Sequence, residues 1–203
     1  MTSRHDIHEP TQPDVIAAER PTVAVDVVLL TAIEGELRVL VARRQEVPYL
    51  DRWALPGVIV RAREALHEAA TRALHDKVGL PATELQQLHA FGEADRDPRS
   101  RVISVAYFAL VPAETLLGSL RQTSERVLAK VIVPWSGVTG GTVEVRHPEG
   151  DVLELAFDHA DIIGKAVQRV RRRLTGHAIG IVDLLDEFPV GELESIHAAI
   201  LGE

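Results

Sequence analysis

The sequence predicts an α+β fold in which helices cover a mixed β-sheet, followed by a smaller helical region. Segments with strand and helix patterns interleave without a regular βαβ rhythm, and a hydrophobic content of 46% with 26% charged residues is ordinary for a globular protein. The patterns become helical after residue 157. We therefore expect a disordered tail at 1–20, a sheet-and-helix domain at 21–157 and a helical C-terminal region at 158–203.

The composition excludes several classes of protein. The 203 residues include no cysteine, which rules out disulfides, thiolate metal sites and a cysteine nucleophile. The net charge of −8 argues against a uniformly basic nucleic-acid-binding coat, although one face can still be basic. No apolar run has the length of a signal peptide or a membrane span, so we expect a soluble cytoplasmic protein.

The first half of the domain predicts a β-hairpin, a short strand and one helix. Residues 23–30 are rich in β-branched side chains and residues 37–42 alternate apolar and polar, with a Glu-Gly-Glu turn between them. A short strand is expected at 58–60. Apolar residues at helical spacing from Glu64 to Lys77 predict a helix, and the following glycine, Gly79, suits a left-handed C-terminal cap.

The second half predicts further strands and then a long helix. Strand patterns cover 84–95, 101–112 and 130–135, a hairpin is expected over 142–157, and residues 113–129 carry mixed signals. Residues 158–174 predict an amphipathic helix with Asp158 as its N-cap. The apolar stripe of this helix comprises Ile162, Ile163, Ala166 and Val170.

One face of the first helix has the spacing of a metal site but not its side chains. Positions 73, 76 and 77 lie on one face of a helix, and three carboxylates there would bind Mg²⁺ or Mn²⁺ and activate water against a pyrophosphate. This chain has Ala73, Asp76 and Lys77. The lysine repels a divalent cation, but it could neutralise Asp76 or contact a phosphate directly.

The stretch around this helix resembles the Nudix box of nucleoside-diphosphate-X hydrolases. The box reads Gly, five residues, Glu, seven residues, then Arg-Glu-apolar-x-Glu-Glu-x-Gly-apolar. The matching residues are Glu64, Arg72, Leu74, Gly79 and Leu80; the departures are Val58 for the first glycine, Ala73 and Lys77 for glutamates, and the shorter acid Asp76. The resemblance implies a Nudix-type αβα sandwich at 21–157 with a degenerate box, which binds a nucleotide-like ligand without efficient metal-dependent hydrolysis.

Two alternatives to this interpretation stay open at the level of sequence. If hydrolysis is retained, Glu64 and Asp76 are the catalytic and metal-binding candidates with Mg²⁺, and other acids such as Glu68 or Glu93 would complete the site. On spacing alone, the segment is an ordinary amphipathic helix whose ion pairs Glu68–Arg72 and Arg72–Asp76 are four residues apart.

The loop after the expected strand at 84–95 is rich in arginine. Arginine forks bind phosphate oxygens through two hydrogen bonds, and the stretch resembles Nudix proteins that recognise ADP-ribose. The ligand-binding candidates are Arg44, Arg72, Lys77, Arg96, Arg99 and Arg101. Within the loop we favour Arg99 and Arg101 over Arg96. The alternative is a surface loop whose charges compensate one another.

The C-terminal region resembles the start of the winged-helix domain of NrtR-type repressors, which are Nudix-related regulators of NAD metabolism. In that family the Nudix domain senses ADP-ribose-like nucleotides and the winged helix binds operator DNA as a dimer. The run Arg171, Arg172 and Arg173 could contact DNA phosphates, or it could complement the dipole at a helix end. The resemblance implies that the recognition helix and wing would follow residue 203, so that this chain is truncated or lacks direct DNA reading.

Together these observations predict a homodimeric regulator that senses ADP-ribose or a related nucleotide. It would need no cofactor, bind operator DNA if the winged helix is complete, and control NAD-related or sugar-related metabolism. The alternatives are a Mg²⁺-dependent Nudix hydrolase of the ADP-ribose type and a pure interaction scaffold with an empty pocket.

Overall fold

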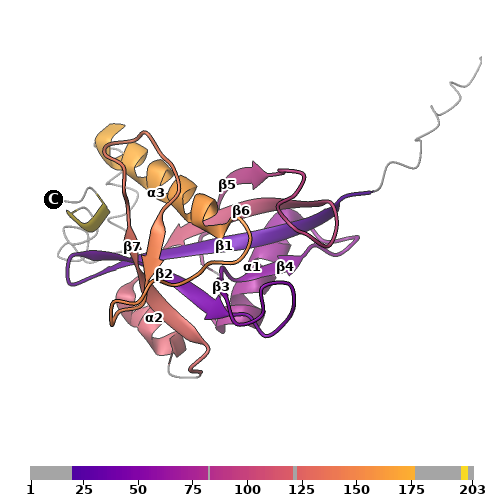
Figure 1. The fold of residues 1–203 in the computed structure, drawn as a ribbon, viewed down its shortest axis with the longest axis horizontal. Helices are drawn as coiled ribbons and strands as arrows, with labels where there is room; N and C mark the ends of the chain where they lie inside the picture. Colours follow the sequence, from indigo (N-terminus) through magenta and orange to yellow (C-terminus); the bar gives the residue numbers. More distant parts are fainter. Residues whose placement is uncertain (1–19, 82, 121–122, 177–197, 201–203) are drawn as a thin grey trace, which may run out of the picture.

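The computed structural model describes residues 20–81, 83–120, 123–176 and 198–200 (Figure 1). The expected tail up to residue 19 and the helical patterns within 177–197 lie outside the described residues. In chain order the elements are β1 (Thr22–Ile33), β2 (Glu36–Arg43), β3 (Trp53–Ala54), β4 (Gly57–Ile59), α1 (Leu66–Val78), β5 (Gln86–Phe91), β6 (Val102–Leu110), α2 (Ala113–Leu120), β7 (Arg126–Ile132), β8 (Glu144–Arg146) and α3 (His159–Gly176).

The strands form one mixed sheet with the order β5-β6-β1-β2-β7-β8. β1 pairs in parallel with β6 along most of its length, and its other edge has two antiparallel partners in turn. Residues 24–26 of β1 pair with β4, and residues 30–33 pair with β2. The sheet therefore divides along this edge of β1, and the loop between β3 and β4 enters at the division, where the Val27 amide donates to the carbonyl of Pro56.

Local sequence signals account for the first hairpin and for the end of α1. The β1–β2 turn has Glu34 and Gly35 at φ values of 54° and 75°, which is the left-handed geometry of a two-residue hairpin turn. Gly79 follows α1 at φ 78°, and its amide donates to the carbonyls of Leu74 and His75. The predicted hairpin and the predicted glycine cap are both confirmed.

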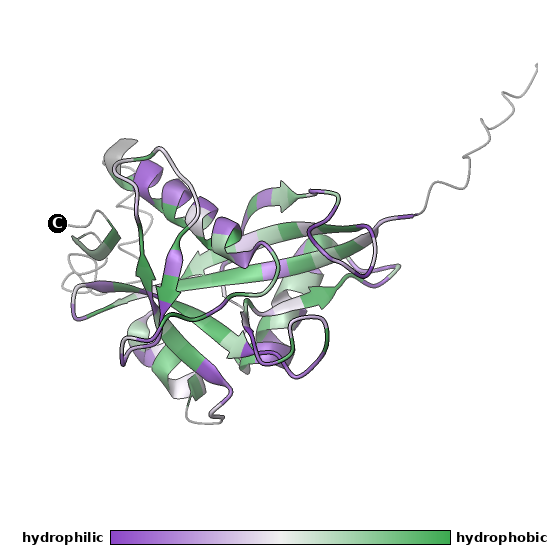
Figure 2. Cartoon of the chain, in the orientation of Figure 1, coloured by the Kyte–Doolittle hydropathy of each residue, from purple (hydrophilic) through white to green (hydrophobic). Residues whose placement is uncertain are grey.

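Two hydrophobic cores lie on the two faces of the sheet, which makes an α/β/α sandwich (Figure 1). One core joins β1 and β6 to α1 and α2, and it contains Ala69, Ala70, Ala73 and Leu74 of α1. The other core contains Ile162, Ile163, Ala166 and Val170 of α3, the predicted stripe of that helix. Apolar residues follow the strands while the outer face of α3 is hydrophilic (Figure 2). The predicted fold class is confirmed.

Two details of the helices differ from the prediction. Helix α2 lies in the segment whose sequence signals were mixed. Its periodicity is weak, because the helix has eight residues and buries only Leu116 and Ser119. Asp158 does precede α3 and its carbonyl accepts from the amides of Asp161 and Ile162, but its carboxylate binds Arg96 instead of capping the helix. α3 shares its core with the sheet and with Ile200. Among the described residues, no helix is both long and apolar enough to cross a membrane.

Candidate functional site

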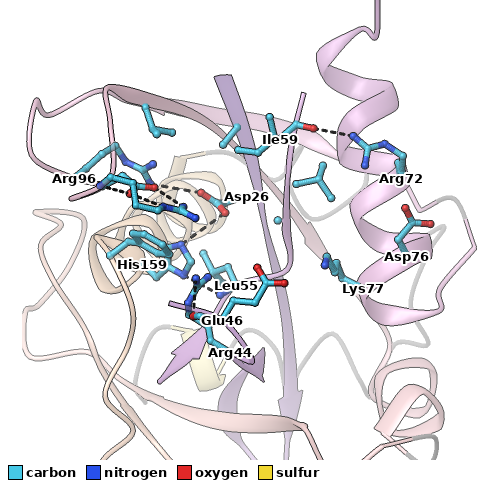
Figure 3. A pocket seen from close by; sticks show the side chains of 17 residues that line it. Asp26, Arg44, Glu46, Leu55, Ile59, Arg72, Asp76, Lys77, Arg96 and His159 are labelled. Atoms are coloured by element: carbon cyan, nitrogen blue, oxygen red, sulfur yellow. Dashed lines mark hydrogen bonds and ion pairs between the residues drawn. The ribbon is translucent and has the colours of Figure 1, made fainter. Parts of the chain in front are cut away.

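A cleft of about 490 Å³ opens beside the division of the sheet. Its walls come from β1, β4, α1, the loop at 96–99 and residues 157–159 just before and at the start of α3 (Figure 3). Cationic and acidic side chains line it together with apolar ones. The cations are Arg44, Arg72, Lys77, Arg96 and Arg99, and the carboxylates are Asp26, Glu46, Asp76 and Asp97. A cleft with these side chains can bind an anionic ligand that also has polar and apolar parts.

Glu64 is bound to Arg72 and does not line the cleft. The arginine donates from Nε at 2.6 Å and from a terminal nitrogen at 2.8 Å, one bond to each carboxylate oxygen. The Arg61 amide adds a third bond at 2.9 Å. The hydrogen bond from Arg72, followed by that from the Arg61 backbone, lowers the pKa of Glu64 to about 2. This pair holds the loop before α1 against the helix.

The three box positions on α1 have different environments. Ala73 is fully buried in the core beneath the helix, whereas Asp76 and Lys77 are exposed and line the cleft (Figure 3). Within the described part of the chain, no three His, Asp or Glu side chains are grouped as metal ligands. Glu64 has both oxygens occupied, position 73 offers no donor, and Lys77 brings a positive charge. These residues do not fit the divalent cation that an intact Nudix box implies.

Arg96 is a buried arginine that connects its loop to the start of α3. Its guanidinium donates to both carboxylate oxygens of Asp158, at 2.8 and 2.6 Å, and lies 3.6 Å from the carboxylate of Asp26. Its side chain is only 4% exposed. Arg96 therefore lines the cleft with its charge already balanced.

The other two loop arginines differ in their access to the cleft. Arg99 is half-exposed, lines the cleft and is bound to Asp97, at 3.0 Å from Nε and 2.7 Å from a terminal nitrogen. Hydrogen bonding to Arg99 lowers the pKa of the Asp97 carboxyl. Arg101 donates to the carbonyl of Glu93 at 3.0 Å and is not among the residues that line the cleft.

Arg44 enters the cleft from the segment after β2. Its guanidinium donates to two backbone carbonyls, those of Pro48 at 3.0 Å and Glu46 at 3.3 Å. It lies over the ring of Phe157, with 4.8 Å between the guanidinium carbon and the ring centroid. Burial and the neighbouring charge of Arg99 lower the pKa of Arg44.

The sequence analysis did not single out the cleft residues Asp26 and His159. The Leu55 amide donates to Nδ1 of His159 at 2.9 Å, so in the neutral ring the proton is on Nε2, which lies 3.7 Å from Asp26. Burial lowers the pKa of His159 and favours this neutral form. Asp26 also accepts from the hydroxyl of Ser104 at 2.5 Å. A carboxylate inside the apolar run Val23–Leu30 was a signal that could have identified Asp26.

The arginines of α3 are not equivalent. Arg171 is buried, donates to the carbonyls of Ile200, Trp135 and Gly137, and lies over the Trp135 ring at 4.8 Å. Arg172 and Arg173 are exposed. Within the run 171–173, Arg172 and Arg173 are thus the residues available to an external partner in this arrangement.

The chain belongs to the NUDIX domain family, which it matches over residues 20–148. It is 29% identical, over 90% of its own length and 67% of the relative's, to the ADPR responsive transcriptional repressor NtrR of Acinetobacter baylyi. It is 34% identical over 43% of its length to an ADP-ribose pyrophosphatase of Methanocaldococcus jannaschii, and the match spans 49% of that enzyme.

Among solved structures the fold is similar to Shewanella oneidensis NrtR. The complex of that protein with a 27mer DNA gives a TM-score of 0.66 at 26% identity, covering 89% of this chain and 76% of the other. Its NUDIX domain with ADP ribose gives 0.55 at 25% identity, covering 79% of this chain and 94% of that one. The chain is thus a Nudix-family homologue of NrtR-type repressors.

Proposed function

We propose that this protein is a transcriptional regulator whose cleft senses ADP-ribose or a related nucleotide without hydrolysing it efficiently. The observation that carries the proposal is the cleft wall formed by α1, where Asp76 is accompanied by Lys77 and by the buried Ala73. Five cationic side chains line the same cleft. The ADP-ribose-responsive repressor and the NrtR complexes with ADP ribose and with DNA support this assignment.

Within the cleft we assign direct ligand contact to Arg44, Lys77 and Arg99, which are cationic and reachable from it. Arg72 and Arg96 hold the walls in place through their carboxylate partners. Arg101 donates to the carbonyl of Glu93 and does not line the cleft.

The DNA-binding part of the proposal rests on the C-terminal region and on homodimer formation. Arg172 and Arg173 are the candidate phosphate contacts, since both are exposed at the end of α3. Each phosphate contact that is lost lowers the salt dependence of DNA binding by about one unit of slope. Fluorescence anisotropy with duplex DNA over a series of salt concentrations should therefore give a smaller slope for an Arg172→Met, Arg173→Met double variant. An unchanged slope would remove these residues from the interface.

The ligand is tested by calorimetric titration with ADP-ribose, accompanied by a product assay in Mg²⁺ and in Mn²⁺. The proposal expects saturable binding, a rise in melting temperature with ligand, and intact ADP-ribose after prolonged incubation. Absence of both heat and thermal shift would refute the proposed ligand class.

A second candidate function is Mg²⁺-dependent hydrolysis of a nucleoside-diphosphate derivative. It is favoured by the exposed carboxylate of Asp76 in the cleft and by the similarity to an ADP-ribose pyrophosphatase. Metal-dependent turnover that disappears in Asp76→Ala, in a variant that still melts like the wild type, would make this the better assignment.

A further inference from the structure

The five cations of the cleft fall into two groups by their partners. Three arginines each give two hydrogen-bond donors to one carboxylate: Arg72 to Glu64, Arg96 to Asp158 and Arg99 to Asp97. Arg44 and Lys77 have no hydrogen bond or ion pair with a carboxylate among the described residues. A cation whose charge is already matched adds little net attraction for an incoming anion, so the attraction comes mainly from Arg44 and Lys77.

Arg44 is fixed in position without being neutralised. Its two bonds to backbone carbonyls and its stacking on Phe157 restrict the guanidinium, which nevertheless keeps further N–H donors. Burial lowers the pKa of Arg44, followed by the charge of Arg99, whereas the carboxylates of Asp97, Glu46 and Asp26 act in the opposite direction. An anion placed beside Arg44 would offset the cost of burying its charge, which is the electrostatic situation of a prepared anion site.

Lys77 borders the same space from the other side. Arg44 and Lys77 both line the cleft and an adjoining cavity of about 310 Å³, and the two cavities share Glu46, Leu55 and Gly57. Lys77 projects from α1, while Arg44 comes from the chain after β2 (Figure 3). Lys77 also occupies a box position where an intact Nudix box has a glutamate. At this position the ammonium of Lys77 therefore supplies the positive charge that a bound metal ion would supply in an intact box.

We infer that Arg44 and Lys77 bind the diphosphate of the ligand directly and make its binding independent of a divalent metal ion. This inference rests on the proposed nucleotide-sensing function and specifies how that site works. In a metal-dependent site the ion bridges protein carboxylates and phosphate oxygens. Here the protein supplies the positive charge itself, and the ligand needs no ion between it and α1.

Glu46 is one of the cleft carboxylates that oppose such binding. It is exposed, lines both cavities and lies close enough to influence the charges of Arg44 and Arg99. Ligand phosphates must compete with it for the cations. A Glu46→Gln variant should therefore bind the ligand more tightly than the wild type, and weaker binding by this variant would contradict the inference.

The test is calorimetric titration of the protein with ADP-ribose, once in EDTA and once in excess Mg²⁺. We expect the same affinity in both. Binding that requires Mg²⁺ would overturn the inference and leave the proposed function standing. If ADP-ribose binds in neither buffer, the proposed function fails, and inorganic pyrophosphate becomes the probe. Pyrophosphate binding in EDTA that depends on Lys77 and Arg44 would then support the inference, and its absence would overturn it.

Variants separate direct phosphate contact from a general charge effect. In EDTA, Lys77→Glu and Arg44→Met should each weaken binding roughly tenfold or more, the scale of a lost charge-assisted hydrogen bond. Lys77→Glu restores an acid beside Asp76, so part of its loss should be recovered in Mg²⁺. The matched controls are Lys165→Glu on α3 and Arg63→Met, an exposed arginine before α1; neither residue lines the cleft.

The controls should bind as the wild type does, and all four variants should melt within a few degrees of it, since the four positions are exposed or half-buried. If Lys77→Glu and Arg44→Met keep wild-type affinity in EDTA, or if the two controls weaken binding equally, the inference is wrong. Lys77→Met gives a second reading, because it removes the charge while keeping the length of the side chain.

Discussion

Replacing Arg96 with methionine should destabilise the protein more than removing any exposed arginine. The guanidinium is 4% exposed and serves two carboxylates that are themselves largely buried, those of Asp158 at 17% and Asp26 at 11% exposure. Removing one partner of a buried ion pair typically costs about 3–5 kcal/mol, because the other charge is left without compensation. For a chain of this length that corresponds to a fall in melting temperature of roughly 6–20 °C.

The assay is thermal denaturation of Arg96→Met, Asp158→Asn and the double variant, with Arg101→Met as the control. The double variant should be more stable than the sum of the two single effects predicts, because the uncompensated carboxylate at 158 is then gone. Arg101 donates only to one backbone carbonyl, so its variant should lose at most about 1 kcal/mol. If Arg96→Met melts within 2–3 °C of the wild type, roughly the effect of 1 kcal/mol, the pair does not hold the loop to α3 and the reasoning fails.

Three further predictions concern single positions. The pKa of Glu64 is lowered from 4.5 to about 2, so the stabilising effect of its carboxylate is complete above pH 4.5 and is lost as the pH falls toward 2. The difference in melting temperature between the wild type and Glu64→Gln should therefore shrink from pH 7 to pH 3, and a constant difference would contradict this. Gly57→Ala would place its Cβ 2.3 Å from a carboxylate oxygen of Asp26, so denaturant unfolding should show a loss of about 1–3 kcal/mol, whereas a neutral effect would mean that the cleft wall yields. Arg171→Met removes the side chain that donates to the carbonyls of Ile200 and Trp135 and should cost about 1–3 kcal/mol. Arg172→Met should stay within about 0.5 kcal/mol by the same assay, and equal losses would refute this distinction.

The elements that were predicted correctly are those whose signals are local. The turn at Glu34-Gly35, the cap at Gly79 and the apolar stripe of α3 each depend on residues within a few positions of one another. Helix α2 was not predicted because a single buried leucine in eight residues gives too little periodicity to recognise.

The cleft was predicted less completely because its residues converge from distant parts of the chain. The partner of Arg96 lies 62 positions further on, and His159 meets Leu55 across 104 positions. Charge and residue type made Arg44 and Lys77 candidates, but only the fold distinguishes arginines with a carboxylate partner from those without one. For the same reason the sequence could not separate the buried Arg171 from its exposed neighbours.

The bond between Glu64 and Arg72 changes what a matching Nudix box can be taken to mean. Glu64 and Arg72 together tie a loop to a helix in this chain, a structural role that is independent of any reaction. The presence of Glu64 and Arg72 in a chain therefore indicates a loop of the right shape, whereas the residues at positions 73 and 77 indicate whether the chain can hydrolyse its ligand. Position 73 is closed within the core here, so a carboxylate at this position would require repacking beneath the helix.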